Sequence, residues 1–375
     1  MYLRNLQLVN FKNYPEAAFE FSDKINCFSG NNGAGKTNLL DAIHYLSFCK
    51  SYFNPVDSQN IRHDEPFFVI HGTYLRNGDN SAAKVSCVQK RNQPKQFSFH
   101  GKEYDRLADH IGLLPVVMVS PYDRDLINDG SEIRRKYIDA VISQFDKLYL
   151  DDLINYNKTL YQRNALLKEF AERHYFDHVM LEVWNEPLVR FGHKIFKKRT
   201  HFIQSFIPVF DEYFGIISGA NEHVNVKYES QLNFETMDKL LYDNLERDRV
   251  IRHTGAGIHK DDLMFEINGY PVKKFGSQGQ QKSFVIAIKL AQFDYTRSIK
   301  GFKPILLLDD IFDKLDDSRV AHVVELVSHN SFGQVFITDT QYERINRLIS
   351  QLTVSSRVWE ISNGSADLLS KNNSQ

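Results

Sequence analysis

The chain has 375 residues, of which 42% are hydrophobic and 25% are charged, and its formal net charge at pH 7 is −1. This length and composition predict a globular protein of about two domains with a large buried core. The near-neutral charge excludes a uniformly basic surface, although it does not exclude local basic patches.

The cysteines and the apolar runs indicate the cellular compartment of the protein. Cys27, Cys49 and Cys87 are odd in number and form no C-x-x-C pair, as expected of reduced thiols in a reducing compartment. The start of the chain has no positive segment followed by a long apolar one, and no apolar run approaches the roughly 18 residues of a membrane span. We therefore expect a soluble cytoplasmic protein without a membrane partner.

The first third alternates short β-like runs with turns and carries a phosphate-binding motif. Residues Gly30–Thr37 fit G-x-x-x-x-G-K-[ST] at every fixed position. The apolar run Ile25–Phe28 precedes the motif, and a helical pattern beginning at Leu39 follows it. Strand, glycine loop and helix form the context in which this motif binds a nucleoside triphosphate. The alternative is a glycine-rich turn that matches by chance, and these flanks disfavour it.

Each residue type in this loop has a chemical reason. Gly30, Gly33 and Gly35 let successive backbone N–H groups point into one concavity, and the following helix adds its positive end. Lys36 can then reach the outer phosphates, and the Thr37 hydroxyl can ligate Mg²⁺. The sequence therefore predicts a site for a nucleoside triphosphate with Mg²⁺.

The middle of the chain is helical in pattern from about Glu132. Two narrow seams, spaced as in a coiled coil, flank a polar and aromatic segment, Ala171–His178, that suits a hairpin tip. The first seam is Leu153, Asn157, Leu160, Asn164 and Leu167, and the second is Leu181, Trp184, Leu188, Phe191 and Ile195, rejoined at Phe202 and Phe206. We favour a projecting helical arm over a plain bundle, because the outer faces are heavily charged. Pro187 indicates either a helix start after Asn185 or a kink.

The last third returns to strands that alternate with helices, which predicts a mostly parallel sheet flanked by helices. The expected strands are Met264–Ile267, Ile305–Leu308, Gln334–Thr338 and Val358–Ile361, and the expected helices are Phe284–Phe293 and Ser318–Val327. Because the phosphate loop lies in the first third, we expect one head built from both ends of the chain, with the helical segment inserted between them.

An apolar strand ending in two acids supplies the second half of a nucleotide site. The strand that begins at Pro304 runs into Asp309 and Asp310, the form of a Walker B element. Asp309 can hold Mg²⁺ directly or through water, and Asp310 can orient or deprotonate the attacking water. The alternative is a buried strand that ends in a polar turn, and the accompanying phosphate loop favours the functional reading.

A second anion-binding pattern lies at Lys274–Lys282, just before a helical run. Gly276, Ser277 and Gly279 at a helix start again present backbone N–H groups to an anion. Where a protein carries both patterns, the second one usually faces a γ-phosphate bound to a partner subunit. The alternative is a capped helix after a glycine turn.

Basic clusters are candidates for contact with DNA. They are Arg134, Arg135 and Lys136, then Lys194, Lys197, Lys198 and Arg199, and finally Lys273 and Lys274. Non-specific DNA binding needs several phosphate contacts, and two modest patches could join into one groove in a dimer. The alternative for any one cluster is solvated surface. Recognition would be of backbone and junction shape rather than of bases.

The order of these motifs resembles the ABC-type ATPase heads of the SMC group, and further stretches narrow the resemblance to the bacterial RecF family. These stretches are Leu8–Tyr14, Cys49–Ser51, Val119–Pro121, Arg134 and Arg135 with Asp139, Tyr156–Lys168, Gly257–Leu263, Gln280–Lys282 and Leu306–Asp316. The resemblance covers nearly the whole chain.

The resemblance implies an α/β fold: an ABC-type P-loop NTPase head with a mixed sheet (1–129 and 216–375) and an inserted helical arm (130–215). It implies a slow, DNA-stimulated ATPase that forms a homodimer when ATP is held between two heads. It also implies binding to double-stranded, gapped or junction DNA and work with RecR and RecO. The expected role is to help load recombinase at gaps, in support of replication restart and the SOS response.

The resemblance also implies roles for individual residues. ATP is expected to contact Lys12, Asn13, Gly30, Asn31, Asn32, Gly33, Ala34, Gly35, Lys36, Thr37 and Asn38, and Ser277, Gly279 and Gln280 are expected to contact it from the other subunit. Thr37 and Asp309 would hold Mg²⁺. Lys36 and Asp310 would be catalytic, and Leu315 with Asp316 resembles a D-loop.

The sequence departs from the family pattern at several positions. Asp339 stands where many ABC ATPases have a switch histidine, and Asp310 is shorter than the usual catalytic Glu, consistent with slow hydrolysis. No glutamine fits a Q-loop, whose place Ser120–Asp123 takes, and the role of His259 is open. Two other functions compete with the repair ATPase. They are an energising subunit of a transporter, which would need a membrane-coupling segment, and a small-molecule kinase, which would have no use for the signature at 276–280.

Overall fold

The computed structural model describes residues 1–76, 79–219, 222–312, 322, 325, 332–350 and 354–372. They form two compact units. Unit 1 comprises residues 1–123, 216–218 and 282–375, and unit 2 comprises residues 124–215 and 219–281. Among the described residues, no helix is long and apolar enough to cross a membrane.

Unit 1 contains two six-stranded sheets. The first is antiparallel, with the order β2-β1-β4-β5-β6-β7. Its strands are β1 (Tyr2–Phe11), β2 (Tyr14–Glu20), β4 (Phe67–Arg76), β5 (Asp79–Lys90), β6 (Gln96–Phe99) and β7 (Lys102–Glu103). Its long strands alternate between buried and exposed positions, as a sheet with one face on the core should.

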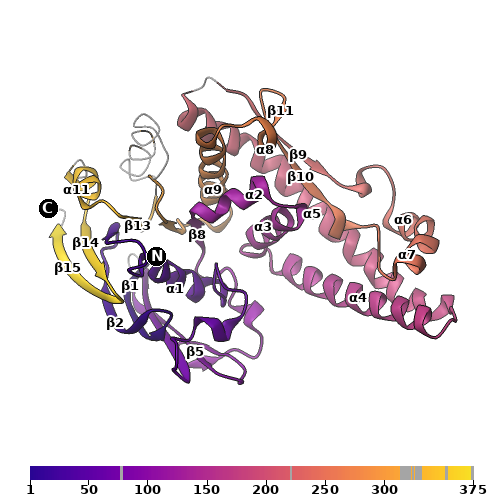
Figure 1. The fold of residues 1–375 in the computed structure, drawn as a ribbon, viewed down its shortest axis with the longest axis horizontal. Helices are drawn as coiled ribbons and strands as arrows, with labels where there is room; N and C mark the ends of the chain where they lie inside the picture. Colours follow the sequence, from indigo (N-terminus) through magenta and orange to yellow (C-terminus); the bar gives the residue numbers. More distant parts are fainter. Residues whose placement is uncertain are drawn as a thin grey trace. The chain divides into compact units, whose positions relative to one another are not determined.

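The second sheet of unit 1 is mixed and has the order β15-β14-β3-β13-β12-β8. Its strands are β3 (Ile25–Ser29), β8 (Val116–Val119), β12 (Ile305–Leu308), β13 (Val335–Asp339), β14 (Ser356–Ser362) and β15 (Ser365–Asn372). The five strands from β14 to β8 are parallel. Strand β15 returns antiparallel beside β14, at the yellow end of the chain (Figure 1). The inner strands are almost wholly apolar because both of their faces are buried.

Helix α1 (Lys36–Phe48) shares one hydrophobic core with both sheets of unit 1. Its Leu39, Ile43 and Leu46 are completely buried together with residues of β1 and β12. Unit 1 also holds α11 (Tyr342–Ser350) and most of α9 (Gln278–Lys300), which begins in unit 2. The prediction of a mixed α/β head built from both ends of the chain is confirmed.

Unit 2 is mainly helical (Figure 1). Its helices are α2 (Asp125–Asn128), α3 (Ser131–Ser143), α4 (Lys147–Glu172), α5 (His178–Ser218), α6 (Met237–Asp243), α7 (Leu245–Ile251) and α8 (Val272–Phe275). Residues 216–218 at the end of α5 are counted with unit 1. A small antiparallel sheet joins β9 (Val224–Glu229), β10 (Asp262–Ile267) and β11 (Tyr270–Pro271). Side-chain carboxylates of Asp146 and Asp177 cap the amino ends of α4 and α5.

The two predicted helices are confirmed as α4 and α5, which run antiparallel. Lys198 pairs with Asp146 at one end, and the Arg163 side chain donates to Asn185 toward the other. The predicted hairpin tip lies between Glu172 and His178. Helix α5 continues through Pro187, so no helix starts at that proline.

Only one of the two predicted seams matches the buried faces of these helices. The second seam is confirmed, since Leu181, Leu188 and Ile195 are completely buried. The first seam is wrong by about one position, because α4 buries a face that includes the polar Thr159 and Arg163, whereas Asn157 of the predicted seam is exposed.

One predicted boundary differs from the structure, and one predicted helix lies mostly outside the described residues. Residues 219–281, which we expected in the head, belong by their contacts to unit 2, because β10 packs on α3 and α8 and pairs with β9. The sequence pattern could not show this, since β10 resembles the strands of the head in composition. The predicted helix Ser318–Val327 and the D-loop residues Leu315 and Asp316 lie almost entirely outside the described residues.

Candidate functional site

The phosphate loop connects β3 to α1 at the carboxyl edge of the parallel sheet. The Lys36 ammonium lies inside the loop, where it donates to the backbone oxygens of Gly30 at 2.7 Å and Asn31 at 3.0 Å. Gly30 has a φ of 148°, and a Cβ there would lie 2.2 Å from the backbone oxygen of Ile361. An ammonium has three donors, so the lysine is positioned to exchange a carbonyl partner for a phosphate oxygen.

The turn between β1 and β2 supports the phosphate loop. The Asn13 amide donates to the backbone oxygen of Ala34 at 2.8 Å and accepts from the Asn38 amide at 2.7 Å. The Tyr14 hydroxyl donates to the backbone oxygen of Gly35 at 3.0 Å. Asn13 therefore contacts Ala34 in the phosphate loop and Asn38 on α1, although they lie 21 and 25 residues further along the chain.

Lys12 lies in the same turn but is held by another group. Its ammonium is 2.6 Å from the buried carboxylate of Asp41 on α1. That carboxylate also accepts from the Ser51 hydroxyl and the Tyr52 amide, both at 2.6 Å. The sequence pattern missed Asp41, because an acid on an otherwise apolar helix face gives no sign of its partners. Contact between Lys12 and nucleotide stays a prediction.

Thr37 and Asp309 meet across the carboxyl edge of the sheet. The Thr37 hydroxyl lies 2.9 Å and 3.0 Å from the two oxygens of the Asp309 carboxylate. Two neighbouring ligands of an octahedral Mg²⁺, each about 2.1 Å from the ion, are about 2.9 Å apart, so this pair fits the ion. No cluster of three or more His, Cys, Asp or Glu side chains suited to a metal occurs in the described part of the chain.

Burial governs the protonation of Asp309. Removal from water raises the pKa of its carboxyl to about 6, against the opposing effect of hydrogen bonds from Thr338 and Thr37. Asp310 follows at a φ of 42°, in the left-handed region that L-residues seldom adopt. Its predicted role in activating water stays a prediction.

Asp339, which stands where many ABC ATPases have a switch histidine, forms an ion pair. Asp339 is buried at the end of β13, and its carboxylate lies 3.1 Å from the Arg344 guanidinium of α11. The Gln341 amide donates to the same carboxylate at 2.8 Å. The acid at position 339 is therefore paired with Arg344, a partner that the sequence around Asp339 could not reveal.

The signature residues lie in unit 2 and form a capping box. The Ser277 amide donates to the Gln280 side chain at 2.7 Å, and the Gln280 amide donates to the Ser277 hydroxyl at 3.2 Å. The Gln280 side-chain amide also donates to Glu222 at 2.7 Å. This geometry is the capped helix that the sequence pattern left as the alternative. It also leaves N–H groups of the first turn, including that of Gly279, without partners inside the helix.

His259 bridges two elements of unit 2 in its neutral form. Its Nε2 lies 3.0 Å from the Thr254 carbonyl, which can only accept, so Nδ1 accepts from the Tyr156 hydroxyl at 2.8 Å. Burial lowers the pKa of His259 to about 4. These contacts explain the residue as a connection between α4 and the loop that precedes β10.

Most of the candidate DNA-binding cations are paired within unit 2. Lys194 and Lys198 lie 3.5 Å and 2.5 Å from the carboxylates of Asp152 and Asp146 on α4. The other pairs are Arg134 with Asp262, Lys136 with Glu132, and Arg199 with both Asp139 and Asp261. Within the described ranges, only Lys197, Lys273 and Lys274 of the candidate cations are exposed and form no ion pair or side-chain hydrogen bond.

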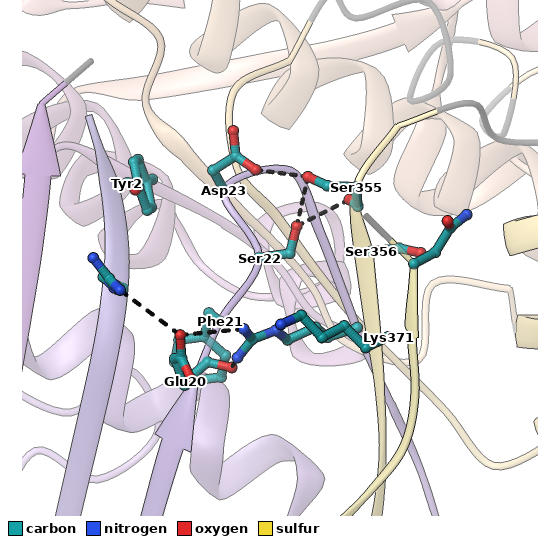
Figure 2. A pocket seen from close by; sticks show the side chains of 11 residues that line it. Tyr2, Glu20, Phe21, Ser22, Asp23, Ser355, Ser356 and Lys371 are labelled. Atoms are coloured by element: carbon teal, nitrogen blue, oxygen red, sulfur yellow. Dashed lines mark hydrogen bonds and ion pairs between the residues drawn. The ribbon is translucent and has the colours of Figure 1, made fainter. Parts of the chain in front are cut away.

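A cavity of about 300 Å³ lies at the opposite, amino edge of the parallel sheet in unit 1 (Figure 2). Ser355 bridges Asp23 and Ser22, and Arg357 pairs with Glu20 at 3.2 Å. These polar groups satisfy one another, so we interpret them as a connection between the strand ends rather than as a ligand site.

The chain is similar in sequence and in fold to known proteins. Residues 2–362 match the family described as RecF/RecN/SMC N terminal domain. The protein named DNA replication and repair protein RecF from Flavobacterium johnsoniae is 51% identical over 96% of this chain and 100% of its own length. The protein of the same name from Phocaeicola vulgatus is 49% identical over 97% of each chain.

Solved structures agree in fold. A structure described as the recombination mediator protein RecF-ATP in the RecFOR pathway superposes with a TM-score of 0.88 at 31% identity, over 98% of each chain. An Smc head domain from Pyrococcus furiosus superposes with a TM-score of 0.58 at 16% identity, over 99% of this chain and 96% of its own. The second likeness concerns the fold alone.

Proposed function

This chain belongs to the RecF family, and from that premise we propose that it is an ATP-dependent DNA-binding ATPase of DNA replication and recombinational repair. The relatives carry the name DNA replication and repair protein, and a relative of the same fold is described with ATP. The observation that carries the proposal is the meeting of Lys36, Thr37 and Asp309 at one edge of the sheet.

The proposed chemistry uses groups whose positions are known. The backbone of the loop from Gly30 and the ammonium of Lys36 hold the phosphates. Thr37 and Asp309 are the residues that would hold Mg²⁺, and the ion would neutralise charge on the phosphate oxygens. Asp310 orients the attacking water, and its short side chain is consistent with slow turnover.

The proposed active form is a homodimer with ATP between two copies of the chain. The exposed Ser277 and the first-turn amides of α9 would approach the γ-phosphate held by the other copy. Anion binding at this helix end needs no charged side chain, which fits a signature made of Gly, Ser and Gln. Dimerisation on ATP follows, because the nucleotide supplies contacts to both copies.

DNA is the proposed macromolecular substrate, as gapped duplex or as a double- to single-stranded junction. Of the candidate basic clusters, Lys197, Lys273 and Lys274 are left for phosphate contacts, and a dimer would double their number. RecR and RecO are the proposed protein partners, because a relative is described in the RecFOR pathway. We propose that the complex acts in the cytoplasm and helps load recombinase.

The test combines ATP hydrolysis with sedimentation velocity, without DNA and with single strands, duplex and gapped duplex. Lys36→Met should abolish hydrolysis and ATP-driven dimers, because the loop loses its cation. Lys102→Met is the matched control, since this exposed lysine on β7 lies outside the site. A wild-type chain that stays monomeric with ATP and ignores DNA would contradict the repair function.

A further inference from the structure

Thr338 is buried between the two halves of the nucleotide site. It lies on β13, the strand that separates β3, which leads into the phosphate loop, from β12, which leads into Asp309. The side chain of Thr338 has no exposure to solvent. In the pairing of β13 with β12, Ile337 is opposite Leu308, so Thr338 is level with Asp309.

The Thr338 hydroxyl contacts both acids that follow β12. It donates to Oδ1 of Asp309 at 2.8 Å and accepts from the backbone amide of Asp310 at 3.0 Å. These directions are fixed, because the ionised carboxylate only accepts and the amide only donates. The same Asp309 oxygen accepts from the Thr37 hydroxyl at 2.9 Å, so two threonine hydroxyls, one from α1 and one from β13, converge on it.

The bond to Asp310 supports an unusual backbone turn. The φ of 42° at Asp310 is in the left-handed region, which costs an L-residue about 1 kcal/mol or more. Strand β12 ends at Leu308, and the backbone turns at Asp310. A hydrogen bond from the Asp310 amide to a buried side chain on the neighbouring strand opposes any return to an extended conformation.

We propose that Thr338 is a positioning residue for ATP hydrolysis, which aims the Asp309 carboxylate at the Thr37 hydroxyl and holds the turn that presents Asp310. The inference rests on the proposed function. It assigns a role to a side chain outside the Walker elements and the signature. Thr338 acts through Asp309 and Asp310 rather than on the nucleotide. Its loss should therefore weaken the binding of Mg²⁺ by Asp309 and the orientation of the attacking water by Asp310.

The test compares Thr338→Val with Thr338→Ser. Valine has nearly the shape of threonine but no hydroxyl, and serine keeps the hydroxyl. Thr296→Val is the matched control, because Thr296 is also fully buried but its hydroxyl has no partner among the described residues. Each variant is assayed for ATP turnover against Mg²⁺ concentration and for equilibrium binding of ATP in Mg²⁺ and in EDTA.

We expect Thr338→Val to lower kcat and to raise the Mg²⁺ concentration for half-maximal turnover, each by about tenfold, because a hydrogen bond to a charged group is lost. ATP binding in EDTA should stay as in the wild type, while the gain in ATP binding on adding Mg²⁺ should shrink. Thr338→Ser should recover most of the loss, and Thr296→Val should change none of these quantities.

Two results would overturn the proposal. One is a Thr338→Val protein with wild-type kcat and Mg²⁺ dependence, and the other is a serine variant as impaired as the valine variant. A wild-type chain that hydrolyses no ATP would instead contradict the proposed function. The Mg²⁺-dependent gain in ATP binding would then still decide the role of Thr338, since it needs no turnover.

Discussion

Arg163 and Asp248 form an ion pair that is completely shielded from solvent. The guanidinium Nη1 lies 2.7 Å from the carboxylate, and both side chains are 0% exposed. The pair joins α4 to α7 in unit 2. Asn185 and Thr254 accept further hydrogen bonds from the guanidinium, and the Gly255 amide donates to the second carboxylate oxygen. The sequence pattern missed this pair, because Arg163 lies in a seam region where only apolar positions carry a signal.

Asp248→Asn should destabilise unit 2 by about 3–5 kcal/mol, because it leaves the Arg163 charge buried without a counter-ion. Asp243→Asn, at an exposed position on α6, is the control and should change little. The two tryptophans lie in different units, so a Trp359→Phe background lets Trp184 fluorescence report urea unfolding of unit 2. Equal midpoints for Asp248→Asn and Asp243→Asn would refute the interpretation.

Two glycines of the phosphate loop should respond differently to alanine. At Gly30 the new Cβ would lie 2.2 Å from the backbone oxygen of Ile361, whereas at Gly33 it would meet nothing within 4 Å. Gly33→Ala should cost about 1 kcal/mol of left-handed strain, and Gly30→Ala should cost more than about 2 kcal/mol. Thermal unfolding without nucleotide measures both. A melting temperature for Gly30→Ala at or above that of Gly33→Ala would contradict the expected clash.

The sequence predicted the elements whose signals are local. The loop from Gly30 and the strand before Asp309 are continuous segments in which strand, turn and helix preferences agree, so their meeting at one sheet edge follows from parallel pairing. The second helical seam was also predictable, since an apolar period along one helix depends only on near neighbours. The first was not, because the buried face of α4 includes the polar Thr159 and Arg163.

The residues whose roles the sequence did not predict depend on contacts between segments that are distant along the chain. Lys194 and Lys198 gave the pattern of a basic stripe, but the register of α5 against α4 places acids opposite both of them. Thr338 had no motif of its own, because its role depends on which strand lies beside it. Residues 219–281 were assigned to the head for the same reason, since strand composition does not reveal which sheet a strand joins.

His259 should make unit 2 lose stability as the pH falls. Its pKa is about 4 in the folded chain against 6.5 for an ordinary histidine, because of burial. The unfolded chain therefore binds a proton between pH 6.5 and 4 that the folded chain does not, and the free energy of unfolding falls over that range. Above pH 6.5 both states carry neutral histidine, so this contribution is constant.

His259→Gln should remove this part of the pH dependence, which amounts to about 3 kcal/mol between pH 6.5 and 4. The measurement is the urea midpoint of unit 2 from pH 7.5 to 4.5 for wild type and variant. Other buried histidines affect both proteins equally and cancel in the difference. His63→Gln is the control, because the His63 side chain is 95% exposed. Parallel pH profiles for wild type and His259→Gln would show that protonation of His259 does not oppose folding.

Ser277→Arg should separate ATP binding from dimerisation. A long cationic side chain at this exposed position would block the approach of a second copy whose phosphate loop holds ATP, while the phosphate loop of the same chain is unchanged. The substitution also removes a helix cap, which costs about 1 kcal/mol. Ser277→Ala removes the same cap without adding bulk, so it should keep most of the ATP-driven dimer. Sedimentation with ATP compares the three proteins.

Mixing two inactive chains gives the sharper form of this experiment. A Lys36→Met chain keeps its signature, and a Ser277→Arg chain keeps its phosphate loop. A dimer of the two therefore contains one complete site, made from the Lys36 of one copy and the Ser277 of the other. The complete site contains no introduced arginine, and the single introduced arginine faces the disabled phosphate loop of the Lys36→Met copy. We therefore expect ATP hydrolysis from the mixture and none from either variant alone. If the mixture stays inactive although the two chains associate, the two motifs do not act on one nucleotide across a dimer.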